Sequence, residues 1–134
     1  IIPMKIYIWV IIITNFLIPS ITGKTHVQQN ETNMLYNTWF LDTYKIESMD
    51  FPPNKREKGD YILFNEDMTY TSTSEGEEEE GTFILNTSGA YVLMVDEKGD
   101  KVKAYIISIS KNSLILKYDI SEISDVEVHY NSSI

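Results

Sequence analysis

The chain has 134 residues, a length that suits a single domain with a core of its own. Its 20 Asp and Glu residues outnumber its 11 Lys and Arg residues, which gives a net charge of −9. Binding to nucleic acid needs clustered Lys and Arg to neutralise phosphates, and no such cluster occurs, so we expect no nucleic-acid partner. The chain contains no cysteine, which excludes disulfides, thiolate metal ligands and cysteine nucleophiles.

The first residues have the order of a secretory signal peptide. Lys5 supplies a positive charge, residues 6–18 are mostly apolar, and Gly23 offers a small residue at the expected cleavage site. We therefore predict a signal peptide over residues 1–23. Residues 1–3 precede the first Met and are interpreted as translated upstream sequence.

An uncleaved membrane anchor is the alternative to cleavage. Asn15 and Pro19 interrupt the apolar run, which is shorter than the roughly 20 residues that a membrane span needs. Cleavage would leave no stable membrane anchor, and no cysteine is present to carry a lipid. We thus expect a secreted or periplasmic protein, with a flexible polar lead over residues 24–35 and a folded domain over residues 36–131.

From residue 36 onward, short segments rich in Tyr, Ile, Val, Thr and Phe alternate with turn signals, a pattern typical of strands. The expected strands are Thr38–Ile46, Tyr61–Asn65, Thr69–Thr73, Thr82–Asn86, Tyr91–Asp96, Lys101–Ser110, Ser113–Asp119 and Asp125–Tyr130. Most connections have two to four residues, and loops this short join antiparallel neighbours. The longer connections are Glu47–Asp60, with Pro52 and Pro53, and the acidic segment Ser74–Gly81.

Eight consecutive antiparallel strands predict an all-β fold, a single up-and-down β-barrel, because closing the sheet removes its exposed edges. A two-sheet sandwich is the competing architecture. Alternation along the strands predicts which side chains face the interior, and the strands at residues 61–65 and 91–96 are apolar on both sides. The expected inward residues are Trp39, Leu41, Ile62, Phe64, Tyr70, Phe83, Leu85, Tyr91, Leu93, Val95, Tyr105, Ile107, Ile109, Leu114, Leu116, Tyr118, Val126, Val128 and Tyr130. Lys103, Lys117, Glu127 and His129 are expected outside.

Several motifs look familiar in their order and spacing. Residues 37–41 (Asn-Thr-Trp-Phe-Leu) are similar to the Gly-x-Trp strand that opens lipocalins. Residues 64–70 (Phe-Asn-Glu-Asp-Met-Thr-Tyr) resemble the F-x-x-D-G-T-Y hairpin of bacterial lipocalin-like domains, and residues 81–85 and 113–118 match the same pattern. The resemblance covers residues 36–130 and implies a lipocalin-like barrel, often with an apolar cavity.

The resemblance also assigns a role to one residue and shows departures from the family pattern. It implies that Trp39 is a structural plug at the closed end of the barrel. Asn37 stands where the family has its first Gly, and Met68 stands in place of the turn Gly. The family often stacks a late Arg over the Trp, whereas Arg56, the single Arg here, comes early.

Little in the sequence favours catalysis or metal binding. The two histidines are His26, in the polar lead, and His129, on an expected outer face, so we predict no enzyme, no cofactor and no metal site. Glu75 and the run Glu77–Glu80 could gather cations, but contiguous Glu residues lack calcium-ligand spacing. We interpret this segment as a solvated, mobile loop.

Two functional hypotheses follow. In the first, a secreted monomeric binding protein holds a small hydrophobic or amphipathic ligand inside the barrel, with Phe51, Pro52 and Pro53 as a lid. The expected ligand-binding residues are Phe64, Tyr70, Phe83, Tyr91, Leu93, Tyr105, Ile107, Leu116 and Tyr118. In the second, the barrel is filled, and the domain meets a protein partner or serves a structural role in the cell envelope.

Overall fold

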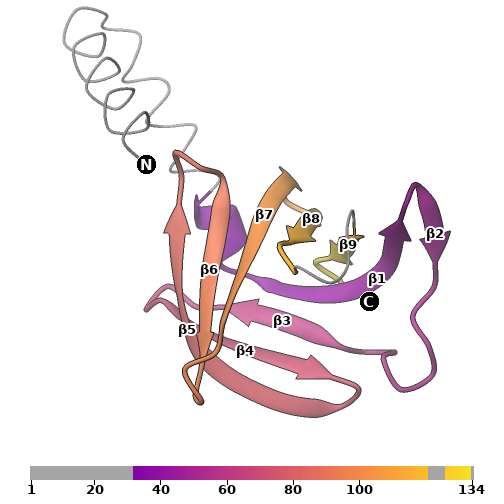
Figure 1. Ribbon diagram of the computed structural model, residues 1–134, viewed down its shortest axis with the longest axis horizontal. Helices are drawn as coiled ribbons and strands as arrows, with labels where there is room; N and C mark the ends of the chain where they lie inside the picture. The colour runs from indigo at the N-terminus through magenta and orange to yellow at the C-terminus, as the bar shows by residue number, and fades with distance from the viewer. Residues whose placement is uncertain (1–31, 121–125, 134) are drawn as a thin grey trace, which may run out of the picture. The chain divides into compact units, whose positions relative to one another are not determined.

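The computed structural model describes residues 32–120 and 126–133, which form one antiparallel sheet that closes into a barrel (Figure 1). Its strands are β1 (Thr38–Ile46), β2 (Met49–Phe51), β3 (Tyr61–Phe64), β4 (Thr69–Ser74), β5 (Glu77–Asn86), β6 (Tyr91–Asp96), β7 (Lys101–Ile109), β8 (Ser113–Tyr118) and β9 (Val126–Asn131). Neighbours in sequence pair throughout β3–β9, and β1 pairs with both β3 and β9. The predicted eight-stranded up-and-down barrel is thus confirmed, with β2 as an additional strand. The predicted signal peptide lies outside the described residues.

Strand β1 closes the barrel by using both of its edges. One edge pairs with β9 over nearly its whole length, from Phe40 opposite Asn131 to Ile46 opposite Val126. The other edge pairs first with β3 and then, near Ile46, with β2. Strand β2 falls in the segment that the sequence assigned to a long loop. It forms because Glu47 and Ser48 adopt φ values of 49° and 69°, the left-handed pair that suits a two-residue hairpin turn.

Seven of the eight predicted strands agree with the structure within one residue at each end, and β5 is the exception. It begins at Glu77 rather than Thr82, so the interpretation of the acidic run as a loop is wrong. Each of its glutamates pairs with a Ser or Thr of β4, from Glu77 opposite Ser74 to Glu80 opposite Thr71. Ladder hydrogen bonds and small β4 partners outweigh the weak strand preference of Glu.

One end of the barrel interior is filled with large side chains. Its centre is Trp39, which is fully buried and donates its indole N–H to the Leu35 carbonyl at 3.0 Å. Phe64 and Phe83 meet edge to face, with their ring centroids 4.9 Å apart. Leu35 belongs to a helical turn at residues 32–35, within the segment that the sequence assigned to the polar lead, yet it is fully buried. Trp39 therefore packs as the plug that the resemblance implied.

The interior faces of β6 and β7 differ from those predicted. Val92 and Met94 are buried, so Tyr91, Leu93 and Val95 point outward. The sequence could not fix this phase because β6 is apolar on both sides, and the inward prediction for its three odd-numbered residues is wrong.

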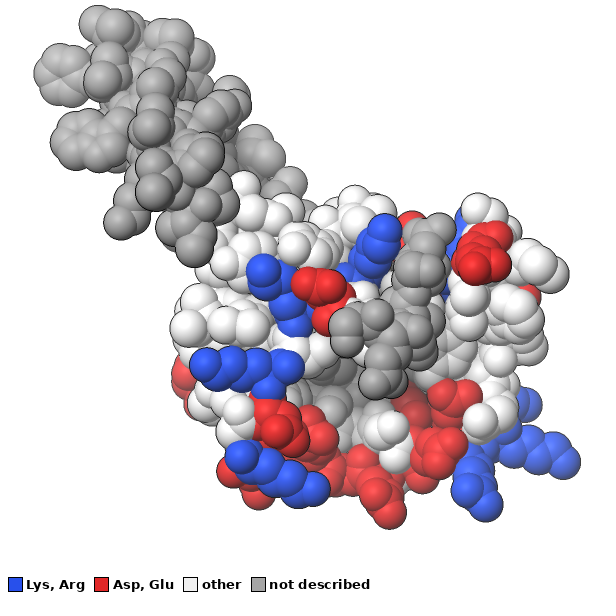
Figure 2. Space-filling view, viewed as in Figure 1, with Lys and Arg blue, Asp and Glu red and all other residues white. Residues whose placement is uncertain are grey.

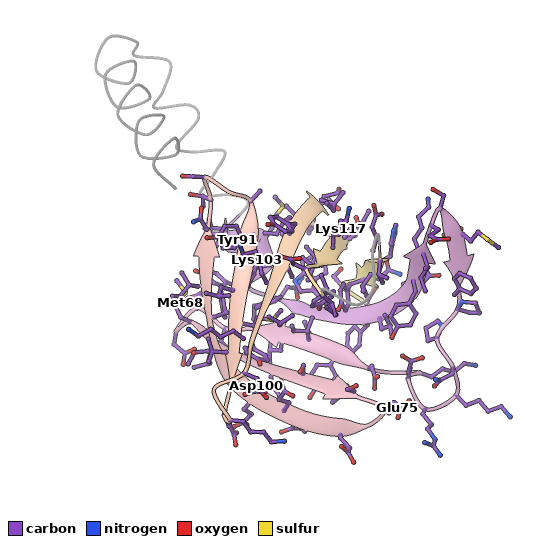
Figure 3. The ribbon with its side chains drawn as sticks, in the orientation of Figure 1. Met68, Glu75, Tyr91, Asp100, Lys103 and Lys117 are labelled. Carbon is purple, nitrogen blue, oxygen red and sulfur yellow. The ribbon has the colours of Figure 1, made fainter. Side chains whose placement is uncertain are left out.

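Strand β7 carries the second correction, since Ala104 is fully buried whereas Tyr105 and Ile107 are 36% and 50% exposed. A bulge between Ile106 and Ser108 shifts the alternation, which leaves Ile107 outside and returns Ile109 to the core. On the outer surface the ammonium group of Lys103 lies 4.6 Å from the ring centroid of Tyr91 (Figure 3).

Among the described residues, no helix has the length and apolarity to cross a bilayer.

Candidate functional site

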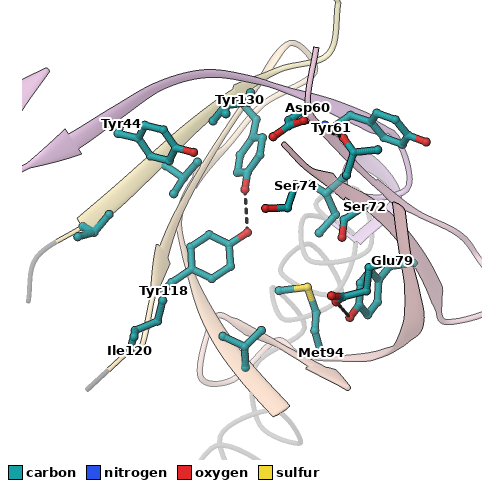
Figure 4. A pocket seen from close by; sticks show the side chains of 17 residues that line it. Tyr44, Asp60, Tyr61, Ser72, Ser74, Glu79, Met94, Tyr118, Ile120 and Tyr130 are labelled. Carbon is teal, nitrogen blue, oxygen red and sulfur yellow. Dashed lines mark hydrogen bonds between the residues drawn. The ribbon is translucent and has the colours of Figure 1, made fainter. Parts of the chain in front are cut away.

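The other end of the barrel interior is hollow. A cavity of about 430 Å³ opens there, which is within the range of sites that hold small organic ligands (Figure 4). Its lining residues are Leu41, Tyr44, Asp60, Tyr61, Ile62, Tyr70, Ser72, Thr73, Ser74, Glu79, Met94, Val102, Tyr118, Ile120, Val126, Val128 and Tyr130. The same strand can contribute residues to both the filled end and the hollow end. On β8, for example, Leu116 belongs to the core and Tyr118 lines the cavity.

A pair of tyrosines from neighbouring strands crosses the interior. The hydroxyl oxygens of Tyr118 on β8 and Tyr130 on β9 lie 2.7 Å apart, as the dashed line in Figure 4 shows. Burial raises the pKa of both phenols, that of Tyr130 well above its ordinary value. Both hydroxyls are therefore neutral at physiological pH. One of the two protons is used within the pair, and the other can meet a ligand.

A second tyrosine lies against an acid of the neighbouring strand. The Tyr70 hydroxyl donates to Oε1 of Glu79 at 3.0 Å. Burial, followed by this hydrogen bond, raises the pKa of the Tyr70 phenol. The ring lies across Gly81, its partner in the β4–β5 ladder, where an added Cβ would come within 2.7 Å of ring atom Cε1. Gly81 thus leaves the space that lets Tyr70 reach Glu79.

Tyr44 lines the cavity because β1 is irregular. A bulge between Leu41 and Thr43 breaks the alternation, so that Leu41 and Tyr44 both pack toward the core. The Tyr44 hydroxyl donates to Oε2 of Glu57. Burial and this hydrogen bond raise the pKa of the Tyr44 phenol.

Asp60 places a carboxylate in the cavity wall. It is 7% exposed and directly precedes β3. Its Oδ2 accepts from the backbone N–H of Glu75 at 2.8 Å, and its Oδ1 accepts from the N–H of Gly76 at 3.2 Å and the hydroxyl of Thr73 at 3.3 Å. These bonds fix the carboxylate against the turn between β4 and β5.

The structure brings together only part of the predicted ligand-binding set. Tyr70 and Tyr118 line the cavity. Phe64, Phe83 and Leu116 are buried in the filled end and do not line it. The remaining four, Tyr91, Leu93, Tyr105 and Ile107, lie on the outer face and are corrected as described above.

Sequence reasoning missed several polar lining residues, among them Tyr44, Asp60, Ser72 and Glu79. Period-two alternation from Tyr70 places Ser72 and Ser74 inside, but a serine is polar and carries no signal for an inward position. Nothing in the sequence pointed to Asp60, which ends the long connection. The lid proposed for Phe51, Pro52 and Pro53 is not found, since the cavity lining includes none of them.

Metal binding finds no support among residues 32–120 and 126–133, where no three His, Asp or Glu side chains are grouped as ligands. Asp96, the last residue of β6, accepts from the backbone N–H groups of Lys98 and Asp100, each at 2.9 Å. This arrangement is an ordinary hairpin turn.

Comparison with known proteins agrees with this architecture. A family model described as a lipocalin-like domain matches residues 35–116. Among solved structures, the barrel is similar to a lipocalin-like protein from Bacteroides uniformis ATCC 8492, with a TM-score of 0.56 and 14% sequence identity over 75% of this chain and 99% of that one. No curated protein sequence matches. The family model spans more than half of the chain, and the chain therefore belongs to the lipocalin-like domain family.

Proposed function

We propose that this protein binds one small amphipathic molecule in the barrel cavity and acts as a carrier or receptor for it rather than as an enzyme. The observation that supports this proposal is the cavity of about 430 Å³ at one end of an otherwise filled barrel. Apolar walls from Ile62, Met94 and Val102 would receive the apolar body of the ligand, and polar side chains of the wall such as Asp60, Ser72 and Glu79 would orient its polar group.

The alternative hypothesis of a completely filled barrel has less support. Leu35, Trp39 and Phe83 fill one end, but the described residues leave the other end hollow. We also propose that the protein acts outside the cytoplasm. That part of the proposal rests on the signal-peptide pattern of residues 1–23 alone.

Titration with a neutral fluorescent probe, N-phenyl-1-naphthylamine, tests the proposal. We expect the probe to bind one site per chain. Ser72 lines the cavity, whereas Thr71, the residue directly before it in β4, points to the other side of the sheet. The two positions therefore offer a matched pair of variants. Ser72→Phe should fill the cavity and weaken probe binding by about tenfold or more, the factor expected when a site built for an apolar group is blocked. Thr71→Phe should leave probe binding unchanged.

Two outcomes would count against a cavity ligand. One is equal probe binding by the Ser72→Phe and Thr71→Phe variants when both retain the wild-type circular dichroism spectrum. The other is no probe binding by the wild-type protein. Native mass spectrometry of the protein purified from its own host would then show whether a bound molecule accompanies it.

A further inference from the structure

We propose that the cavity selects a cationic amphipath, an apolar molecule with a protonated amine, and discriminates against anionic amphipaths such as fatty-acid carboxylates. This inference rests on the proposed function, since the sign of a ligand's charge matters only if a ligand binds. It follows from the charges, the burial and the hydrogen-bond directions of the lining residues.

The ionisable lining residues provide negative charge without a matching positive charge. Asp60 and Glu79 contribute carboxylates, and among the described residues that line the cavity none is Lys, Arg or His. Between described residues, a guanidinium nitrogen of Arg56 lies 4.0 Å from the Glu75 carboxylate and the His129 ring lies 3.4 Å from that of Glu127, and neither contact includes Asp60 or Glu79. A cationic group in the cavity would find attraction from these two acids, whereas a carboxylate would be repelled.

Asp60 is the stronger part of this argument because it is the most deeply placed charge. At 7% exposure it is largely removed from water, and its contacts are two backbone N–H groups and one hydroxyl. Hydrogen bonds of this kind stabilise a carboxylate but leave its net charge in place. A buried charge without an opposite charge is unfavourable, and a bound ammonium group would offset that penalty.

The hydrogen-bond directions point the same way. Tyr44 and Tyr70 donate their hydroxyl protons to Glu57 and Glu79, so their phenolic oxygens have lone pairs to offer and no free proton. The pair formed by Tyr118 and Tyr130 uses one of its two protons internally. The wall therefore presents more acceptors than donors, which complements a ligand that brings N–H donors.

The arrangement of the lining residues gives the bound molecule a direction. Figure 4 shows Asp60, Ser72 and Glu79 on one side of the cavity, across from Tyr118 and Ile120. The amine is expected on that acidic side. The wider surface has the same sign, since Figure 2 shows Asp and Glu side chains gathered along the lower edge of the view, where Figure 3 labels Glu75 and Asp100. A field of this sign also favours the approach of cations over anions.

Three probes with the same ten-carbon chain test the selection: decylamine, decanol and decanoate, each below its micelle concentration at pH 7 and constant salt. Their affinities are measured by displacement of N-phenyl-1-naphthylamine. We expect decylammonium to bind about tenfold or more tightly than decanoate, with decanol between them, as one or two partly screened charges would produce.

Matched variants assign the effect to the carboxylates. Glu79→Gln should reduce the preference for decylammonium over decanoate by about threefold to tenfold. Glu78→Gln removes the same charge from the residue directly before Glu79 in β5, and that residue points to the other side of the sheet. This variant should leave the preference close to that of the wild type. Asp60→Asn should reduce the preference further, provided that circular dichroism shows an intact fold, because Asp60 also holds a turn.

The outcomes separate this inference from the proposed function. Equal affinity for the three probes, or tighter binding of decanoate, would overturn charge selection while leaving the cavity as a binding site. Equal effects of Glu79→Gln and Glu78→Gln would also overturn it, because the preference would then come from overall charge. Failure of every probe, including N-phenyl-1-naphthylamine, would remove the proposed function and this inference together.

Discussion

The hydroxyl oxygens of Tyr118 and Tyr130 lie 2.7 Å apart although the two residues are not opposite each other in the sheet. The β8–β9 register places Tyr130 opposite Leu114, four residues before Tyr118, so each ring leans along the barrel to reach the other. Their hydrogen bond links the filled end, where Leu114 is buried, to the cavity. It is therefore the contact that joins the packed core to the cavity wall.

Removing one hydroxyl of this pair should destabilise the protein by more than half of what removing both hydroxyls does. We predict that Tyr118→Phe and Tyr130→Phe each lower the free energy of unfolding by about 1 kcal/mol, because each leaves a buried hydroxyl without its partner. The double variant should lose clearly less than the sum, since two matched apolar rings remain. Urea denaturation of the four proteins measures this coupling, and strictly additive losses would contradict it.

The buried tyrosines predict a loss of stability at high pH. Burial raises the pKa of Tyr118 and Tyr130 in the folded protein above the value of about 10 in the unfolded chain. Above pH 10 the unfolded chain releases these protons first, so the stability that the neutral phenols provide is complete below pH 10 and declines as pH rises toward their folded pKa values. Each fully protected tyrosine should contribute a decline of up to about 1.4 kcal/mol per pH unit.

Urea midpoints between pH 8 and pH 11.5, with absorbance at 295 nm to follow phenolate formation, would measure this decline. The variant with both Tyr118→Phe and Tyr130→Phe serves as the control and should show a shallower decline. Identical slopes in the two proteins would show that other groups cause the alkaline loss.

Met68 occupies a backbone position that favours glycine. Its φ of 68° is left-handed, in the turn between β3 and β4 where similar hairpins have Gly (Figure 3). We predict that Met68→Gly raises the free energy of unfolding by about 0.5–1 kcal/mol, because relief of the Cβ strain exceeds the added freedom of the unfolded chain. Met68→Ala keeps the Cβ and should give no gain. A thermal or urea midpoint measures both, and a loss with Met68→Gly would show that the exposed Met side chain contributes more than the strain removes.

Gly81 connects the sheet to the cavity. A Cβ at this position would collide with the carbonyl oxygen of Val95 and approach the ring of Tyr70. We predict that Gly81→Ala lowers the free energy of unfolding by about 1–3 kcal/mol and weakens probe binding, because Tyr70 must move away from Glu79. Gly99→Ala, in the turn between β6 and β7 where nothing lies within 4 Å, is a useful comparison because its left-handed backbone should also make alanine destabilising, while probe binding should stay unchanged. Unaltered binding by Gly81→Ala would show that Tyr70 does not shape the cavity.

Local residue preferences were sufficient to predict the barrel. Runs rich in Val, Ile, Tyr and Thr alternate with short turns, and both signals depend on neighbouring residues alone. The role of Trp39 as a plug could also be predicted, because Trp39 stands at the start of the first strand, in the same place as in similar sequences. Strand β2 was missed as a whole, since its three residues depend on a turn that lacks glycine at Glu47 and Ser48.

The side on which each residue lies was harder to predict, and the candidate site depended on it. Bulges at Leu41/Thr43 and Ile106/Ser108 shift the alternation by one residue, and no sequence signal marks them. One constraint was available, because Lys103 and Tyr105 are two residues apart on a strand and share a side. A lysine that must face water therefore places Tyr105 outside as well.

The sequence did not predict the acidic cavity wall, for a related reason. Four consecutive glutamates favour a loop when they are considered alone, but their β4 partners are Ser and Thr, which make a paired strand acceptable. Once the segment is a strand, alternation sends Glu79 toward the cavity and Glu78 away from it. Pairing between segments, which a single sequence does not reveal, thus decided the charge of the site.

The separation of a filled end from a hollow end has a consequence for how such a barrel can diverge. Substitutions around Trp39 and Phe83 alter the packing that folding depends on, whereas substitutions at Ser72, Ser74 or Val102 change the shape of the cavity. A lineage could therefore reshape the cavity through mutations that scarcely affect the folding equilibrium. The same division would let a protein engineer redesign the hollow end while the filled end serves as an unaltered foundation.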